Sequence, residues 1–351
     1  MADAEVVFPH LEGLPPTLKD STVGTPDRRP GSVRRTSTLD MVWPDGLGTD
    51  LNLVGRSRDL MTPRAGDAEV LAEATMRVVV GEGRKVLEAE VTPTREGIGG
   101  LVGAVGGSEL RGAIERVLPG EREAATPLYL LLDDIAGTSL IAGFAWSRAR
   151  PELRERMRER RSEAPVGESF GVRKGKVICS GLRPDGWADT HWKNGLFPEH
   201  GMVPAGDIRT PEDSLGWHEF PPAPEVGMRR HRRVDAWREG DEVHVDAFFR
   251  DACWEPDGSQ IVLHEYRVEA QIDAETGTLR AAEATPHVLP YPECKWAAPN
   301  ASALEGMRVS EFRNTVQRTL VELKACTHLN DMLRCLAEVP ALVGELEERA
   351  A

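Results

Sequence analysis

The sequence lacks the features of membrane and secreted proteins. No stretch reaches the roughly 18 consecutive apolar residues that a transmembrane helix needs. The N-terminal segment MADAEVVFPHLEG has no basic stretch followed by an apolar one, which argues against a secretory signal. The five cysteines are scattered and form no CxxC pair, as is typical of proteins from a reducing compartment. These absences predict a cytoplasmic protein.

Common nucleotide-binding and hydrolase motifs are also absent. The glycine-rich segment 97–107 has no phosphate-loop lysine and no strand–GxGxxG–helix context, so we expect no nucleotide cofactor. Neither GxSxG nor HExxH occurs. With 43 basic and 57 acidic residues the net charge is -14, which would repel nucleic acid and anionic lipid. We therefore expect a small-molecule ligand, no nucleic-acid or membrane partner, and a possible homodimer.

The chain has the composition of a globular protein, with 40% hydrophobic and 28% charged residues. Strand-like alternation is followed by helical spacing, and this order occurs twice. The expected strands are 35–42, 50–59, 73–80 and 85–92, then 232–237, 242–250, 261–272 and 278–284. The expected helices are 108–118 and 126–136, then 310–323 and 327–337. This order predicts an α+β fold of two tandem, pseudo-twofold copies of an antiparallel sheet followed by C-terminal helices.

Short blocks of sequence recur in the two halves in the same order. Residues 34–40 (RRTSTLD) correspond to 229–235 (RRHRRVD) at a shift of 195, and 108–111 (SELR) correspond to 310–313 (SEFR). Such recurrence indicates an internal duplication. It divides the chain into a flexible arm (1–32), a degenerate first repeat (33–146), a helical or loop linker packed across the repeats (147–228), and a second repeat with the candidate site (229–351). Within the linker, the charge-dense segment 148–161 is predicted to be an exposed helix.

The two halves differ where chemistry could occur. The first half has ATPL at 125–128, where the second has CTHL at 326–329. A proline-stiffened loop, LPYPEC, adds Cys294 to the second half. The thiols and the imidazole are therefore confined to the second half, and we expect the chemistry there.

Cys326 is expected at the start of a helix, where free N–H groups and the helix dipole favour a thiolate. This makes Cys326 the candidate nucleophile and His328 its acid or base, with Tyr291 and Asp331 as proton or orientation partners. The alternative is that His328 makes a polar contact at a buried helix end. His264, on a predicted strand, is expected at the sheet surface rather than as a ligand.

A metal site is a second interpretation of the same residues. Cys294, Cys326 and His328 could supply three ligands to zinc or iron, with water or a carboxylate as the fourth. Without a CxxC pair the spacing is not diagnostic. The alternative is that both cysteines are inert and pack as small hydrophobic residues.

Several motifs of the second half resemble a known bacterial family. Residues 229–235, 291–294 (YPEC), 304–306 (LEG) and 326–329 (CTHL) resemble the bacterial domain-of-unknown-function family number 2889, over about residues 214–340. This family implies kinship but no activity. The placement of Cys294 and Cys326 after a sheet and at a late helix also resembles the NifU-type iron–sulfur scaffold fold, although the first cysteine motif of that fold is missing.

Three functional hypotheses follow from these patterns. The first is an enzyme, independent of nucleotide cofactors, that applies lyase, hydrolase or isomerase chemistry to a small, mostly apolar metabolite. The second is a metal or iron–sulfur binding module. The third is a structural or interaction protein in which the cysteines belong to the core.

Overall fold

The computed structural model describes residues 20–46, 48–149, 171–173, 175–194 and 201–350. Residues 1–19 of the predicted arm and most of the predicted helix at 148–161 lie outside the described residues. One helical stretch, Pro127–Arg148, is long and apolar enough to cross a membrane by length and composition alone. Most of it (72% of its apolar window) is buried inside the fold, as in the core helix of a soluble domain. The compartment stays a prediction.

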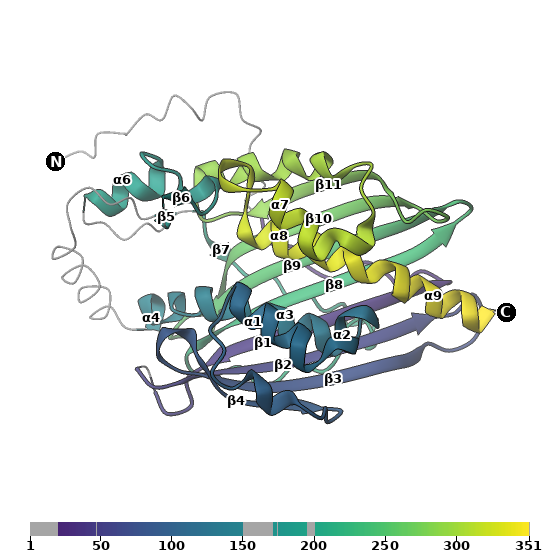
Figure 1. Ribbon diagram of the computed structural model, residues 1–351, viewed down its shortest axis with the longest axis horizontal. Coiled ribbons are helices and arrows are strands. Elements are labelled where there is room, and N and C mark those ends of the chain that lie inside the picture. The colour runs from purple at the N-terminus through teal and green to yellow at the C-terminus, as the bar shows by residue number, and fades with distance from the viewer. Residues whose placement is uncertain (1–19, 47, 150–170, 174, 195–200, 351) are drawn as a thin grey trace.

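One antiparallel sheet runs through both halves of the chain (Figure 1). Its strand order is β11-β10-β9-β8-β1-β2-β3-β4, and the short strand β7 (Val203–Pro204) pairs with β10. The first half supplies β1 (Ser32–Val42), β2 (Leu51–Thr62), β3 (Glu69–Val80) and β4 (Val86–Thr92). The second supplies β8 (Gly227–Glu239), β9 (Glu242–Trp254), β10 (Gln260–Asp273) and β11 (Leu279–Val288). A separate two-stranded sheet contains β5 (Val172–Arg173) and β6 (Lys176–Val177).

The halves join where β1 pairs with β8, and the register of this pair is symmetric. Ser37 lies opposite Arg232, the residue 195 positions later, so the pairs on either side of this point are related by symmetry: Arg34 faces Asp235 as Arg229 faces Asp40. Two cross-strand ion pairs follow from this register: Arg34 with Asp235, and Arg229 with Asp40. The pseudo-twofold arrangement of the predicted fold class is thus present in the strand register. The common origin of the halves and the four-part division of the chain stay predictions.

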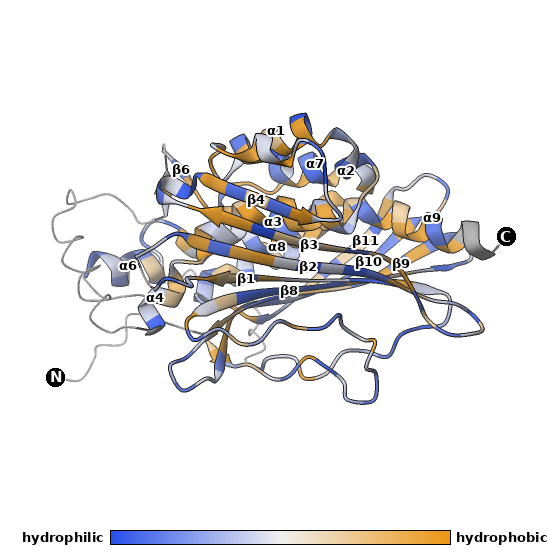
Figure 2. Ribbon diagram, turned by 90° about the horizontal axis from the view of Figure 1, so that it is seen from below, coloured by the Kyte–Doolittle hydropathy of each residue, from blue (hydrophilic) through white to orange (hydrophobic). Residues whose placement is uncertain are grey.

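Helices cover one face of the sheet, and loops cover the other (Figure 2). The first half contributes α1 (Ser108–Val117), α2 (Pro119–Glu123), α3 (Pro127–Ile141) and α4 (Phe144–Ala149). The second half contributes α7 (Phe312–Thr319), α8 (Thr327–Cys335) and α9 (Val339–Ala350). In the sequence, α6 (Trp187–Lys193) comes between the two halves. Each half has its own apolar core beneath its helices.

Local sequence explains where the central helices begin. The Thr126 side chain accepts a hydrogen bond from the Tyr129 N–H (3.1 Å), and Pro127 occupies the first position of α3, where its missing N–H costs nothing. The four main predicted helices are present, but α9 and the 3-10 segment Pro292–Leu304 were not predicted. That segment contains Pro299, and its apolar residues do not recur every 3.6 positions, because a 3-10 helix has about three residues per turn.

The loop-covered face is held by polar contacts with residues 20–31 and 201–226. Thr22 donates to Glu265, and Arg28 forms an ion pair with Asp213 (2.8 Å). The two ring nitrogens of His218 lie 2.9 and 2.8 Å from the hydroxyls of Thr36 and Thr38 on β1. Both faces of the central strands are therefore covered.

Candidate functional site

A network of buried arginines and carboxylates fills the space between the central strands and the helices. We call it the central ion network. It consists of Arg35, Arg111, Arg230, Arg232, Arg313 and Arg334 with Asp59, Asp133, Asp134, Asp251, Asp331 and Glu338. Arginine suits such a site because its planar guanidinium can bind two carboxylates at once. Buried ions of this kind are tolerated only when they are paired.

Arg230 of β8 is the hub of this network and is 1% exposed. Its Nε and Nη2 atoms each donate to Asp251 of β9 at 2.9 Å. Its Nη1 atom lies 3.2 Å from Asp134 of α3 and 3.5 Å from Asp331 of α8. Although burial opposes the charge, Asp251 and Asp134 raise the pKa of Arg230 above its usual range. This one guanidinium therefore links both halves.

Asp133 shows the same balance of forces on the carboxylate side. Burial alone would raise its pKa, but the guanidiniums of Arg334, Arg313 and Arg111 hold the pKa of Asp133 well below its usual range. Asp133 lies on α3 of the first half, whereas Arg313 and Arg334 lie on helices of the second. The network therefore also attaches the helices of one half to those of the other.

His328 lies beside this network at the first turn of α8. Its Nε2 atom is 3.5 Å from Asp251 Oδ2, and its Nδ1 atom is 3.4 Å from the Thr327 hydroxyl and 4.0 Å from Cys326 Sγ. Burial, together with Arg230 and Arg232, lowers the pKa of His328 well below its usual range. The imidazole is therefore neutral at physiological pH, with polar partners at both nitrogens.

His264 of β10 stacks on His328, with ring centroids 3.5 Å apart and an interplanar angle of 19°. It is buried, so the predicted position at an exposed sheet surface is wrong: this part of the sheet lies under α8. Burial lowers the pKa of His264 well below its usual range, and its Nδ1 atom has no hydrogen-bond partner. His264 faces Asp251 across the β9–β10 pair.

Cys326 is the residue directly before α8, as predicted, but its surroundings are apolar. It is 3% exposed and belongs to the core of the second half. Burial raises the pKa of the Cys326 thiol, against the lowering effects of Tyr266 and of the N–H groups of Leu329 and His328. The thiol is therefore protonated, the opposite of the direction expected from the helix end alone.

Cys294 lies near Cys326 in the apolar core of the second half, whereas Tyr291 is only partly buried beside that core and Asp331 lies elsewhere. Burial, with Cys326 and Cys179 nearby, raises the pKa of Cys294 well above its usual range. Tyr291 stacks on Trp187, with ring centroids 5.9 Å apart. Asp331 belongs to the central ion network. The structure thus brings Cys326 and His328 together, links Asp331 to His328 through Arg230 and Asp251, and places Tyr291 against α6.

One group of residues has the spacing of a metal site: ligand atoms of Asp251, His264 and His328 lie within 4.8 Å of one another. Each imidazole nitrogen binds a metal through a lone pair in the plane of its ring. Because the two rings are stacked, a single ion cannot lie close to both ring planes. Both oxygens of Asp251 also accept from Arg230. The arrangement fits a hydrogen-bonded cluster better than a metal centre, and the site of Cys294, Cys326 and His328 stays a prediction.

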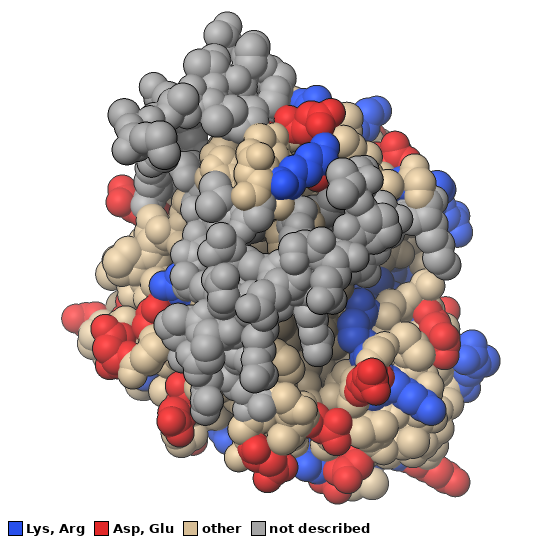
Figure 3. Space-filling model, turned by 90° about the vertical axis from the view of Figure 1, so that its left-hand side faces the viewer, with Lys and Arg blue, Asp and Glu red and all other residues tan. Residues whose placement is uncertain are grey.

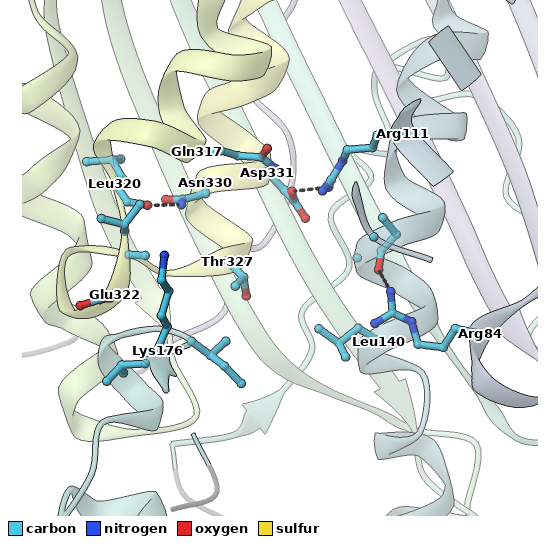
Figure 4. A pocket seen from close by; sticks show the side chains of 17 residues that line it. Arg84, Arg111, Leu140, Lys176, Gln317, Leu320, Glu322, Thr327, Asn330 and Asp331 are labelled. Carbon is cyan, nitrogen blue, oxygen red and sulfur yellow. Dashed lines mark hydrogen bonds and ion pairs between the residues drawn. The ribbon is translucent and has the colours of Figure 1, made fainter. Parts of the chain in front are cut away.

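A pocket of about 560 Å³ lies where the helices of the two halves meet (Figure 4). We call it the interhalf pocket. Its lining consists of Arg84, Gly107, Arg111, Ala136, Gly137, Leu140, Lys176, Val177, Ile178, Gln317, Leu320, Val321, Glu322, Ala325, Thr327, Asn330 and Asp331. Thr327 lines the pocket and its hydroxyl lies 3.4 Å from His328 Nδ1, whereas His328 itself, like Cys294, Cys326 and Tyr291, is not among the lining residues. Of the predicted site residues, Asp331 lines the pocket directly, and His328 is separated from it by Thr327.

Comparison with known proteins gives a match to part of the second half. A family model described as a protein of unknown function (DUF2889) matches residues 228–341, from β8 into α9. No curated protein and no solved structure matches the chain. The match supports the predicted kinship of the second half and brings no activity with it. The likeness to the iron–sulfur scaffold fold stays a prediction.

Sequence reasoning missed several residues of this site. Asp251 and Arg230 lie on strands, and the pattern of alternation gives no sign that they pair. Lys176 comes from the linker and Arg111 from the first half. Because the sequence predicts the chemistry in the second half, it does not point to either residue. The one available signal was the block Arg229-Arg230, whose recurrence in both halves marks the two strands that meet at the centre.

Proposed function

We propose that the chain is an enzyme that binds a small molecule in the interhalf pocket and acts on it by acid–base chemistry at His328, without a nucleotide cofactor. One observation carries this proposal: His328 presents Nδ1 toward Thr327 of the pocket and Nε2 toward Asp251, which Arg230 fixes. Lyase, hydrolase and isomerase reactions all use proton transfer of this kind.

Each group has a defined part in this chemistry. Asp251 accepts a hydrogen bond from the Nε2–H group of His328. This contact fixes the tautomer in which Nδ1 carries a lone pair and can accept a proton. The imidazole is neutral, which is the form that can accept a proton. The distances of 3.4 and 3.5 Å are long, and such contacts commonly shorten when a ligand binds. Asp331, held by Arg111 and Arg334, is the orientation partner inside the pocket.

Cys326 has a different part in this proposal. Its protonated thiol is buried in the apolar core of the second half and is not among the groups that line the interhalf pocket. We assign it to packing at the start of α8 rather than to nucleophilic attack.

Turnover of a small-molecule mixture tests this assignment. The full chain is incubated with a cell extract depleted of protein, and changes in concentration are followed by NMR. We expect His328→Gln to abolish the change that the wild type produces, and Cys326→Ala to keep it, with both folds checked by circular dichroism. Loss of turnover in a folded Cys326→Ala protein together with full turnover in His328→Gln would reverse the two roles.

A metal-binding module is the second candidate, and the spacing of Asp251, His264 and His328 favours it. It requires one imidazole to leave the stack. Elemental analysis of protein purified without a metal-affinity tag tests it. Zinc or iron lost in His264→Ala but kept in Cys294→Ala would place the metal at this cluster, whereas the reverse would place it at the cysteines. Metal below stoichiometric amounts in the wild type would exclude this candidate.

A further inference from the structure

The lining of the interhalf pocket is rich in positive groups from three separate elements. Arg84 precedes β4, Arg111 lies on α1, and Lys176 lies on β6. The Lys176 side chain points into the pocket (Figure 4). Lys176 is exposed, and no ion pair joins it to a carboxylate of the described residues. We infer that the pocket binds a small organic anion, a carboxylate or a phosphate, that carries a short apolar body.

This inference rests on the proposed function, because it names the class of ligand for the same pocket. The net negative charge of the chain makes a group of cations in one pocket unusual. A protein of net charge -14 repels anions on average, so anion binding needs a local concentration of cations. Basic and acidic side chains are interspersed on the face shown in Figure 3, without a broad basic patch among the residues drawn in colour. Positive groups directed into one pocket are therefore a local feature.

Arg111 is already paired with Asp133 (3.0 Å) and Asp331 (3.4 Å), so an anion in the pocket would be attracted mainly by Lys176 and Arg84. Asp331 is shared among three guanidiniums, those of Arg334, Arg111 and Arg230, at 3.3, 3.4 and 3.5 Å. Its charge is therefore already compensated from within the protein. Glu322 is the other acidic residue of the lining, and it is exposed.

The start of α8 adds a second positive feature. Thr327, the first residue of this nine-residue helix, lines the pocket, so the positive end of the helix dipole lies beside it, while the N–H groups of His328 and Leu329 are directed at Cys326. Independently, Asn330 lines the pocket and is only 9% exposed. Its Nδ2 atom donates to the Leu320 carbonyl at 2.9 Å, but its Oδ1 atom has no partner. A hydroxyl or amino group next to the anion would give this acceptor a donor.

Apart from the polar Gln317, the remaining lining is apolar. It consists of Leu140, Val177, Ile178, Leu320 and Val321, together with alanine and glycine. Such side chains favour a hydrocarbon body beside the charged group. The expected ligand is thus a short hydroxy or amino acid, or a phosphate ester, with an aliphatic or aromatic body.

Direct binding to the full chain tests this inference. The probes are 2-hydroxycarboxylates of increasing chain length, each paired with its neutral primary amide, and inorganic phosphate with a short alkyl phosphate as a separate arm. We expect one anionic arm to bind in calorimetry and the matched neutral compounds to bind at least about tenfold more weakly, since charge-assisted hydrogen bonds are lost. Lys176→Gln should weaken anion binding about tenfold. Lys324→Gln removes an exposed lysine outside the lining and should leave it unchanged.

Three results would overturn the inference. These are equal affinity for an acid and its amide, equal affinity of Lys176→Gln and Lys324→Gln for the anion, or no binding in either anionic arm. None of these results bears on the role of His328, because that role is tested by the turnover of His328→Gln. Conversely, a His328→Gln protein that keeps full turnover would refute the proposed function, even if anion binding still depended on Lys176.

Discussion

Gly137 lines the pocket where α3 of the first half meets charged side chains of the second, and replacing it should loosen this contact. It lies inside α3, and a Cβ added there would be 2.7 Å from Asp331 Oδ2 and 2.8 Å from Arg230 Nη1. Real Cβ atoms do not come so close, so the central ion network would have to shift. Overpacking of this kind costs about 1–3 kcal/mol. An alanine inside a helix recovers up to about 1 kcal/mol through its higher helix propensity.

Gly344 provides a matched control, because it lies inside α9 and a Cβ there would meet no atom within 4 Å. The gain in helix propensity is common to Gly137→Ala and Gly344→Ala. The difference between them therefore measures the overpacking alone, and we expect Gly344→Ala to be the more stable by about 1–3 kcal/mol. Unfolding in urea, followed by circular dichroism at 25 °C, gives this difference. If both variants were stabilised equally, the close contact between α3 and α8 would be refuted, and with it the shape of the interhalf pocket.

Two further predictions concern buried charge. Arg230→Met should lower the free energy of unfolding by about 3–5 kcal/mol, because it leaves Asp251 without its guanidinium; a loss below about 1 kcal/mol in urea unfolding would contradict the role of Arg230 as hub. Burial lowers the pKa of His218 to about 3 from an ordinary 6.5, so only the unfolded chain takes up this proton as the pH falls below about 6.5. Stability should therefore be complete above that pH and fall by about 2 kcal/mol at about pH 5 on account of His218. His218→Gln should remove that part of the pH dependence in thermal or urea unfolding, and an unchanged slope would show that His218 also protonates when folded.

The elements of the fold follow from the sequence because alternation and helical spacing report which face of each segment is buried. The recurrence at a shift of 195 goes further, since it identifies the two strands that meet at the centre. What the sequence hides is the burial of their charges. The run Arg34–Asp40 is mostly polar and has the composition of an exposed strand, yet every residue in it is buried. Partners such as Asp235 become visible only when the register of β1 and β8 is known.

The candidate site shows the same limit more sharply. Cys326 and His328 are neighbours in sequence, so their proximity is predictable. Asp251 and His264 join them only because a register shift in the β9–β10 pair, between Val262 and His264, sets His264 opposite Asp251. A bulge of this kind moves a side chain relative to its neighbours without leaving a clear trace in composition. The pKa of Cys326 was missed for a related reason, because its direction depends on core packing rather than on the helix end.

The symmetric pairing of β1 with β8 has a consequence for any chain that holds only the second half. The family match spans residues 228–341 and includes β8 but not β1, which covers one edge of β8 along eleven residues. A protein with the second half alone would leave that edge open, and open strand edges recruit another strand. The β8 strand of a second copy could pair with this edge, with Arg232 at the centre of the pairing. The pocket of such a protein would lack Arg84, Arg111 and Lys176. In this chain the first half takes the place of such a second copy: it covers the edge of β8 and supplies one wall of the interhalf pocket.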